Sequence, residues 1–119
     1  MINRGRRLRT NSAIRDLVRE NTLTSKDLIF PIFVVEGENI KEEIYSMKGN
    51  FHWSIDRLDE IIKEVVDLGI RGIILFGLPE AKDEYGTESY NEDGIVQKAI
   101  RKVRETASDL YVIADVCMC

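Results

Sequence analysis

The sequence predicts an α/β protein in which the strands of a parallel sheet alternate with helices. Three segments, 28–35, 70–76 and 111–119, contain apolar and largely β-branched runs of the kind found in buried parallel strands. Two intervening segments, 54–68 and 93–107, repeat apolar residues at helical spacing. This alternation favours parallel pairing through right-handed crossovers. Three strands and two helices make the start of an α/β sheet or barrel, so we expect a longer protein.

Composition and charge argue against several classes of function. A chain of 119 residues is long enough for one modest domain and too short for two. Its net charge of -4 argues against nucleic-acid or membrane-surface binding, and we see neither a secretory signal nor a membrane span. A bridge between the only two cysteines, two positions apart, is unfavourable because such side chains lie about 6.5–7 Å apart in a strand. We therefore expect a cytoplasmic protein with reduced thiols.

Residues 1–26 are predicted to form an N-terminal arm that contains a short helix. The first ten residues hold four arginines and no acidic residue. Asn11 or Ser12 can cap a helix that carries Ile14, Leu17 and Val18 on one face. Three interpretations of the arm stay open: a solvated, partly disordered segment, a docking arm for a partner or a sister subunit, or, less favoured, an RNA-binding or organelle-targeting segment.

The first strand, within 27–36, contains a proline, and a long polar segment follows it. Pro31 cannot donate a hydrogen bond to a sheet, so the strand begins near Ile32 or has a free edge there. Segment 39–53 shows no sustained period and is predicted to be a long loop, with a local hairpin as an alternative. It carries the only histidine, His52, to which we assign no role.

Polar residues mark the ends of the two predicted helices. Ser54 is expected to cap the first helix, and Gly69 to end it in the left-handed conformation. Asp93 is expected to cap the second helix. The polar loop 80–91 lies at the carboxyl end of the second strand. Two interpretations of this loop stay open: it is simply solvated, or it contacts a substrate.

The third strand ends in an Asp-x-Cys-x-Cys motif. Side chains of a strand alternate between faces, so Asp115, Cys117 and Cys119 share one face. The carboxyl end of a parallel strand is where α/β proteins usually place their chemistry. Ordinary packing, metal ligation and a redox pair all remain open for the two thiols. They do not complete a zinc site by themselves, because zinc takes three or four protein ligands.

Seven short segments, taken in order, are similar to the porphobilinogen synthase (5-aminolevulinate dehydratase) family. They are 6–9 (RRLR), 28–37 (LIFPIFVVEG), 46–49 (SMKG), 75–79 (LFGLP), 82–88 (KD and GTE), 93–94 (DG) and 114–119 (ADVCMC). Each segment alone is weak, but the combination is specific and spans nearly the whole chain. One departure is Lys48, where the family more often has proline.

The resemblance implies a (β/α)8 TIM barrel preceded by the arm, which wraps a neighbouring subunit in a homo-octamer. Residues 27–119 would be the first β/α units, truncated after the third strand. The implied activity is the condensation of two 5-aminolevulinate molecules to porphobilinogen, a lyase step of haem and other tetrapyrrole biosynthesis. The family's Schiff-base lysines lie on later strands, so we expect the 119-residue chain alone to be inactive.

The resemblance also implies roles for the terminal motif. Cys117 and Cys119 match the first two of three zinc-binding cysteines, the third lying beyond this chain. Asp115 matches an acidic residue of the same active-site strand and is our candidate catalytic residue. Retention of both thiols favours zinc, with magnesium as a further candidate metal in the full-length enzyme. Lys82 is not expected to replace a Schiff-base lysine.

Two alternatives come from other functional classes. A small non-enzymatic α/β regulatory or binding module has about this length, although it would need more strands. An assembly fragment in which the arm alone acts is the other alternative.

Overall fold

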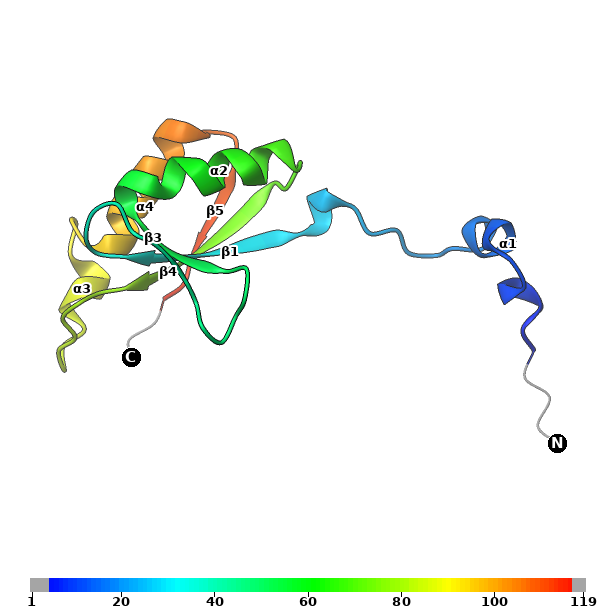
Figure 1. The fold of residues 1–119 in the computed structure, drawn as a ribbon, viewed down its shortest axis with the longest axis horizontal. Coiled ribbons are helices and arrows are strands. Elements are labelled where there is room, and N and C mark those ends of the chain that lie inside the picture. The colour runs from blue at the N-terminus through cyan, green and yellow to red at the C-terminus, as the bar shows by residue number, and fades with distance from the viewer. Residues whose placement is uncertain (1–4, 117–119) are drawn as a thin grey trace.

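The computed structural model describes residues 5–116, and Figure 1 shows their arrangement. The strands are β1 (Ile29–Val35), β2 (Lys41–Glu43), β3 (Phe51–Ser54), β4 (Gly72–Leu78) and β5 (Tyr111–Ala114). The α-helices are α1 (Ser12–Leu17), α2 (Leu58–Asp67), α3 (Thr87–Tyr90) and α4 (Ile95–Thr106), with 3-10 turns at Arg7–Arg9, Ser25–Asp27 and Ile55–Arg57. Within residues 5–116, no helix has the length and apolar character needed to cross a bilayer.

One five-stranded sheet, in the order β2-β3-β1-β4-β5, organises the chain. The three predicted strands correspond to β1, β4 and β5, and they pair in parallel as expected. The pairing of β1 with β4 is the longest and runs from Ile29 opposite Gly72 to Val35 opposite Leu78. The carboxyl ends of these strands therefore lie at one edge of the sheet.

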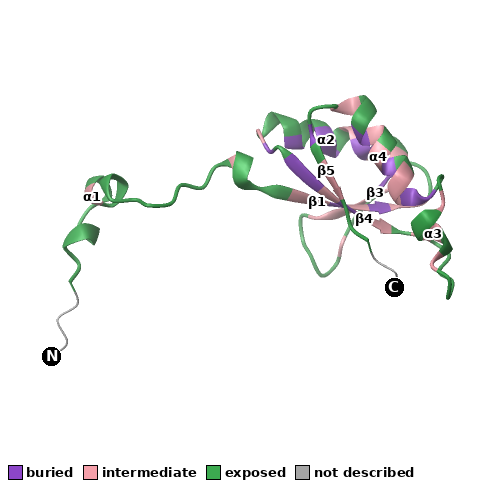
Figure 2. Ribbon diagram, turned by 180° about the vertical axis from the view of Figure 1, so that it is seen from behind, coloured by how far each residue is buried: buried purple, intermediate pink, exposed green. Residues whose placement is uncertain are grey.

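Helices cover one face of this sheet. Helices α2 and α4 pack against each other on the same side (Figure 1). Figure 2 shows the buried residues concentrated on the strands and on α2 and α4, and the largest fully buried apolar side chains are Ile32, Val34, Ile73, Leu75, Leu58, Ile62, Val65 and Val103. Phe33, Ile74 and Phe76 alternate with them in sequence and are only half-buried. Helices on one side and apolar side chains on the other are what the wall of a (β/α)8 barrel requires.

The free edge predicted at Pro31 is present in the structure. β1 begins at Ile29, so the alternative of a later start near Ile32 is wrong. Pro31 lies opposite Ile74 of β4 on one side. On the other side, β3 pairs with β1 only from Phe33 onward. Among the described residues, no neighbouring strand therefore lies where Pro31 would have to donate the missing hydrogen bond.

The prediction of a long loop over 39–53 is partly wrong. β2 and β3 form an antiparallel hairpin, which was the alternative, but β3 also adds to the main sheet, parallel to β1. Trp53 lies opposite Val34 and is 4% exposed, so burial of a large aromatic side chain stabilises this four-residue strand. A strand this short shows too little alternation to be detected by its period.

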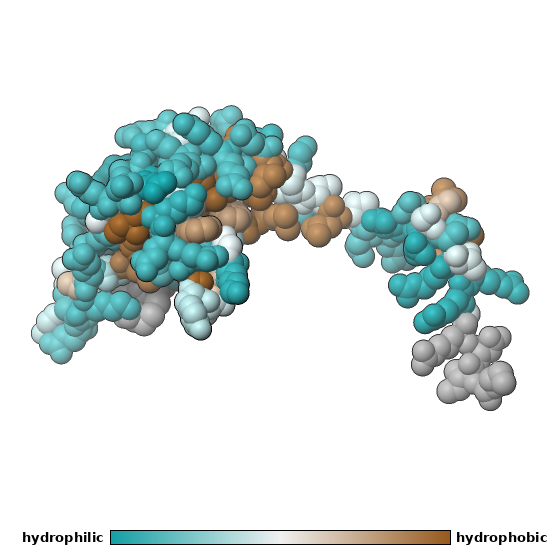
Figure 3. Space-filling view, viewed as in Figure 1, coloured by the Kyte–Doolittle hydropathy of each residue, from teal (hydrophilic) through white to brown (hydrophobic). Residues whose placement is uncertain are grey.

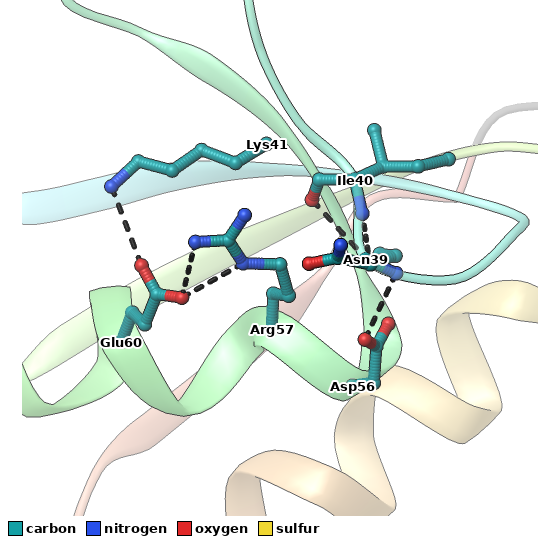
Figure 4. A network of polar contacts seen from close by, with 7 residues as sticks. Asn39, Ile40, Lys41, Asp56, Arg57 and Glu60 are labelled. Atoms are coloured by element: carbon teal, nitrogen blue, oxygen red, sulfur yellow. Dashed lines mark hydrogen bonds and ion pairs between the residues drawn. The ribbon is translucent and has the colours of Figure 1, made fainter.

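Polar contacts join the segment before β2 to the residues that lead from β3 into α2 (Figure 4). The buried Ser54 hydroxyl accepts a hydrogen bond from the Ile40 backbone N–H at 2.8 Å and lies 3.3 Å from the Ile40 carbonyl oxygen, to which it donates. Asp56 accepts from the Asn39 N–H at 2.9 Å. The Ser54 side chain therefore does not make the predicted capping hydrogen bond, because its hydroxyl is used by Ile40.

Lys41 on β2 links the hairpin to α2 by two kinds of contact. Its ammonium group lies 3.4 Å from a Glu60 carboxylate oxygen, and Glu60 also holds Arg57 at 2.6 Å (Figure 4). The same ammonium group lies 4.7 Å from the centre of the Trp53 ring, within the range of a cation–π interaction. The hairpin is therefore held to the body by charge as well as by burial.

The end of α2 is as predicted, but the start of α4 is not. Gly69 adopts a φ of +76° as predicted, and the N–H groups of Gly69 and Ile70 bond to the carbonyls of Val66 and Val65 in a Schellman motif. Asp93 does not cap α4, since Gly94 occupies the N-cap position. The Asp93 carboxylate instead pairs with Arg101 at 2.8 Å, a full charge that competes with the capping contact.

A polar bridge joins the two helices on their outer side. The Asp59 carboxylate accepts a hydrogen bond from the Thr106 hydroxyl and lies 3.0 Å from the Lys102 ammonium nitrogen. The bond from Thr106, followed by that from Lys102, lowers the pKa of Asp59 below its ordinary value. Asp59 is therefore held in the charged form that makes the bridge.

The arm leaves the sheet as an extended segment that carries α1 far from the body (Figure 1). Asn11 caps α1, as one of the two predicted candidates, by accepting a hydrogen bond from the Ile14 N–H at 2.9 Å. Apolar side chains of the arm are exposed, with Leu17 at 85% and Leu23 at 77%. Figure 3 shows a hydrophobic band that runs along the body and continues to the point where the arm leaves it.

Replacement of Ser54 by alanine should lower the free energy of unfolding by about 1–3 kcal/mol, because the partly buried Ile40 N–H loses its acceptor. Chemical denaturation of the protein that carries this chain measures the change. The matched control is Ser108→Ala, at an exposed serine after α4, with an expected change within about 0.5 kcal/mol. Equal effects of the two substitutions would contradict the fastening role of Ser54.

Candidate functional site

A cavity of about 400 Å³ lies at the carboxyl ends of β1, β4 and β5. The strands contribute Phe33, Phe76 and Asp115 to its wall, and the loop after β4 contributes Lys82 and Glu88. The amino-terminal turns of α4 complete it. A smaller cavity of about 310 Å³ lies at the opposite end, between α2 and the chain that enters β5. The larger one occupies the edge at which α/β barrels carry their chemistry.

Aromatic rings form one wall of this cavity. Phe33 and Phe76 occupy paired positions of β1 and β4, and their rings stack with centres 5.3 Å apart. His52, opposite Phe33 on β3, meets the Phe33 ring edge-on at 6.4 Å. The histidine therefore packs against the aromatic pair, which gives no reason to assign it a catalytic role. The stack makes a flat and apolar surface beside the charged residues.

Asp115 lies at the end of the third predicted strand. β5 ends at Ala114, earlier than the predicted 111–119, but the Asp115 N–H still donates to the Leu75 carbonyl at 3.2 Å. Continuing the pairing of Leu75 with Ala114 by one residue sets Asp115 beside Phe76. The side chain is exposed and lines the cavity. The structure therefore brings this predicted residue to the aromatic wall.

Cys117 and Cys119, the predicted metal ligands, lie outside the described residues. Within residues 5–116, no group of three or more His, Cys, Asp or Glu side chains is arranged to hold a metal ion. The metal assignment therefore stays a prediction for these two thiols.

Local hydrogen bonds order the loop that closes the cavity. Asp83 accepts from the backbone N–H groups of Tyr85 and Thr87, at 3.1 and 2.9 Å. Hydrogen bonds from the side chain and then the backbone of Thr87 lower the pKa of Asp83. Gly86 has a φ of +62°, a left-handed conformation that glycine tolerates best, and α3 follows it. Segment 80–91, predicted as a plain loop, therefore contains a short helix.

A glycine lets α4 approach the end of β4. A Cβ atom on Gly77 would lie 2.5 Å from a Val96 side-chain carbon and 2.7 Å from one of Ile95. Any larger residue at position 77 would push the start of α4 away from the sheet. β4 runs on to Leu78, two residues beyond the predicted segment 70–76, so Gly77 lies within the strand.

Glu88 belongs to the loop for which the sequence left a substrate-contacting role open, and no specific role was assigned to it. Its Oε1 atom accepts a hydrogen bond from the Asn91 side chain at 3.1 Å. Its Oε2 atom is buried and has no hydrogen-bond partner among the described residues. The residue faces the cavity from α3. The sequence does not indicate that Oε2 is buried, because this burial depends on the tertiary structure around α3.

Comparison with known proteins identifies the family. A model of the family described as delta-aminolevulinic acid dehydratase matches residues 2–119. The chain belongs to this family. The resemblance drawn from the sequence motifs is therefore confirmed.

Two curated relatives carry the name delta-aminolevulinic acid dehydratase. The protein of Ruminiclostridium josui is 46% identical over 119 residues, which are all of this chain and 58% of that protein. The protein of Halalkalibacterium halodurans is 53% identical over 116 residues, which are 98% of this chain and 35% of that protein. The chain therefore spans less than two thirds of the length of these family members.

A solved structure has the same fold over nearly the whole of this chain. The delta-aminolevulinic acid dehydratase (porphobilinogen synthase) of Toxoplasma gondii ME49, solved with its reaction product porphobilinogen, matches with a TM-score of 0.89 at 35% identity. The match covers 99% of this chain and 34% of that chain. The predicted fold class, part of a TIM barrel preceded by an arm, is confirmed by this match to a TIM-barrel enzyme.

Proposed function

We propose that the full-length protein is a porphobilinogen synthase, which condenses two 5-aminolevulinate molecules to porphobilinogen in tetrapyrrole biosynthesis. The observation that carries the proposal is the family match over residues 2–119. A structural relative bound to porphobilinogen, at a TM-score of 0.89, supports it. The family match also favours an enzyme over the alternatives of a regulatory module or an assembly fragment.

Asp115 is the residue of this chain proposed to act on substrate. It lines the cavity at the carboxyl ends of the strands, beside the stacked Phe33 and Phe76. A carboxylate there can orient an amine and accept or return a proton. The aromatic wall excludes water from one side, which strengthens such a charge interaction.

Zinc is the proposed metal of the full-length enzyme, held by Cys117, Cys119 and a third cysteine that follows them. The donor set fits, because two thiolates two positions apart in the sequence supply soft ligands of the kind that zinc prefers. A bound zinc ion supplies Lewis acidity toward a carbonyl or a bound water. Magnesium is proposed as a further metal, outside this site.

Assembly and location complete the proposal. Residues 1–26 are proposed to wrap a neighbouring subunit of a homo-octamer, which would cover the exposed Leu17 and Leu23 of the arm. We place the enzyme in the cytoplasm, where thiols remain reduced.

The test of this function is an assay of porphobilinogen formation from 5-aminolevulinate by the full-length protein, paired with zinc analysis. We expect turnover in that protein and none in the 119-residue chain, because we place the Schiff-base lysines outside it. Absence of turnover in the full-length protein would refute the function. Turnover by the 119 residues alone would refute the assignment of covalent catalysis to later strands.

Cys117→Ala or Cys119→Ala in the full-length protein should lower zinc content and turnover together, by about 10- to 100-fold or more, since even indirect contacts to a metal are worth that much. Metal analysis and the porphobilinogen assay on the same preparation measure both. Met118→Leu, between the two, is the control and should change neither. Unchanged zinc stoichiometry in the cysteine variants would rule out the ligand assignment.

Asp115→Asn should retain most of the zinc and lose turnover by about 10²- to 10⁴-fold, the usual contribution of a positioned acid or base. The amide keeps the size of the side chain and removes its charge. Asp109→Asn, at an exposed position before β5, is the control. Normal turnover in Asp115→Asn would remove this residue from the mechanism.

A further inference from the structure

Charged groups of both signs line the cavity at the carboxyl ends of the strands. Asp115 and Glu88 are anionic, and Lys82 is cationic. Most of the remaining wall is apolar, with Phe33 and Phe76 on the sheet side. A small molecule that carries both charges and a short carbon chain would match such a wall.

The Glu88 carboxylate is the group in this wall that carries a buried oxygen without a hydrogen-bond partner among the described residues. One oxygen accepts from Asn91, and the buried Oε2 atom accepts from no described residue. None of the ion pairs within residues 5–116 includes Glu88. Leaving a buried anionic oxygen unpaired is unfavourable, so a donor that enters the cavity would gain a strong contact there.

The loop holds Glu88 in place before any ligand arrives. Ser89 donates its hydroxyl proton to the Gly86 carbonyl at 2.7 Å, and Gln97 of α4 donates to the Ser89 carbonyl at 3.2 Å. A Cβ atom on Gly94 would lie 2.8 Å from the Glu88 carbonyl oxygen, so the chain after α3 packs tightly against this residue. These contacts hold the backbone of Glu88, and the hydrogen bond from Asn91 restrains its carboxylate. A carboxylate restrained in this way loses less side-chain entropy when it binds a ligand.

We propose that Glu88 is a binding residue for the primary ammonium group of the small molecule held in this cavity. The inference rests on the proposed function, which makes that molecule one of the two 5-aminolevulinate substrates. This substrate carries one ammonium group, one ketone and one carboxylate. A charge-assisted hydrogen bond from its ammonium group to Oε2 would satisfy the unpaired oxygen. Lys82 lines the same cavity and is the matching cation for the substrate carboxylate.

The experiment compares 5-aminolevulinate with 4-oxopentanoate, which has the same skeleton without the amine, on full-length Glu88→Gln and wild-type enzyme. We expect the KM for 5-aminolevulinate to rise about 10- to 100-fold, the range for a lost hydrogen bond to a charged group. Inhibition by 4-oxopentanoate should be unchanged. Glu84→Gln, at an exposed position of the same loop and away from the cavity, is the control and should alter neither constant.

Two results would overturn the inference. An equal loss of affinity for both compounds would mean that Glu88 only maintains the loop, as would be found if it paired internally with Lys82. Unchanged affinity for both would mean that it does not contact the ligand.

Failure of the proposed function would be visible separately, as a wild-type protein that forms no porphobilinogen. Calorimetric binding of the two compounds, which needs no turnover, decides the role of Glu88 in that case. A preference of the wild type for the amine that Glu88→Gln loses supports the inference, and its absence refutes it.

Discussion

The parallel pairing of β1 with β4 is the contact on which the rest of the structure depends. Seven residues of each strand are in register, and this register aligns Phe33 with Phe76 and brings both strand ends to one edge. β5 adds to β4 and carries Asp115 to the same edge. The helices α2 and α4 then cover one face only, so the aromatic side chains of the other face remain available to a cavity.

Much of this fold could be predicted from the sequence because its main elements carry long periodic signals. The apolar runs of β1 and β4 and the faces of α2 and α4 extend over several turns or pleats, and Gly69 has the one conformation that its position allows. β3 was missed because four residues show too little alternation. Ser54 occupies the N-cap position of the turn that leads into α2, but its hydroxyl bonds to Ile40 and makes no capping hydrogen bond. Asp93 was misassigned as a cap, because its carboxylate pairs with Arg101 instead.

The candidate site was predictable only where it coincides with a motif. Asp115 belongs to a motif at a strand end, and the structure brings it to the cavity with Phe33 and Phe76. Cys117 and Cys119 belong to the same motif, and their role as ligands stays a prediction. The sequence placed Glu88 in a loop open to a substrate-contacting role, but it did not indicate the buried Oε2 atom, whose burial depends on the tertiary structure around α3.

The proline in β1 has a consequence for the solubility of the chain. An unpaired strand edge is a template on which a second copy can add a strand, and β1 is apolar along its length. Pro31 removes one donor from that edge, where β3 does not reach. A foreign strand would leave a hydrogen bond unmade at this point and bind less well. Among the described residues, one missing proton donor therefore weakens edge-to-edge pairing along the part of β1 that β3 leaves free.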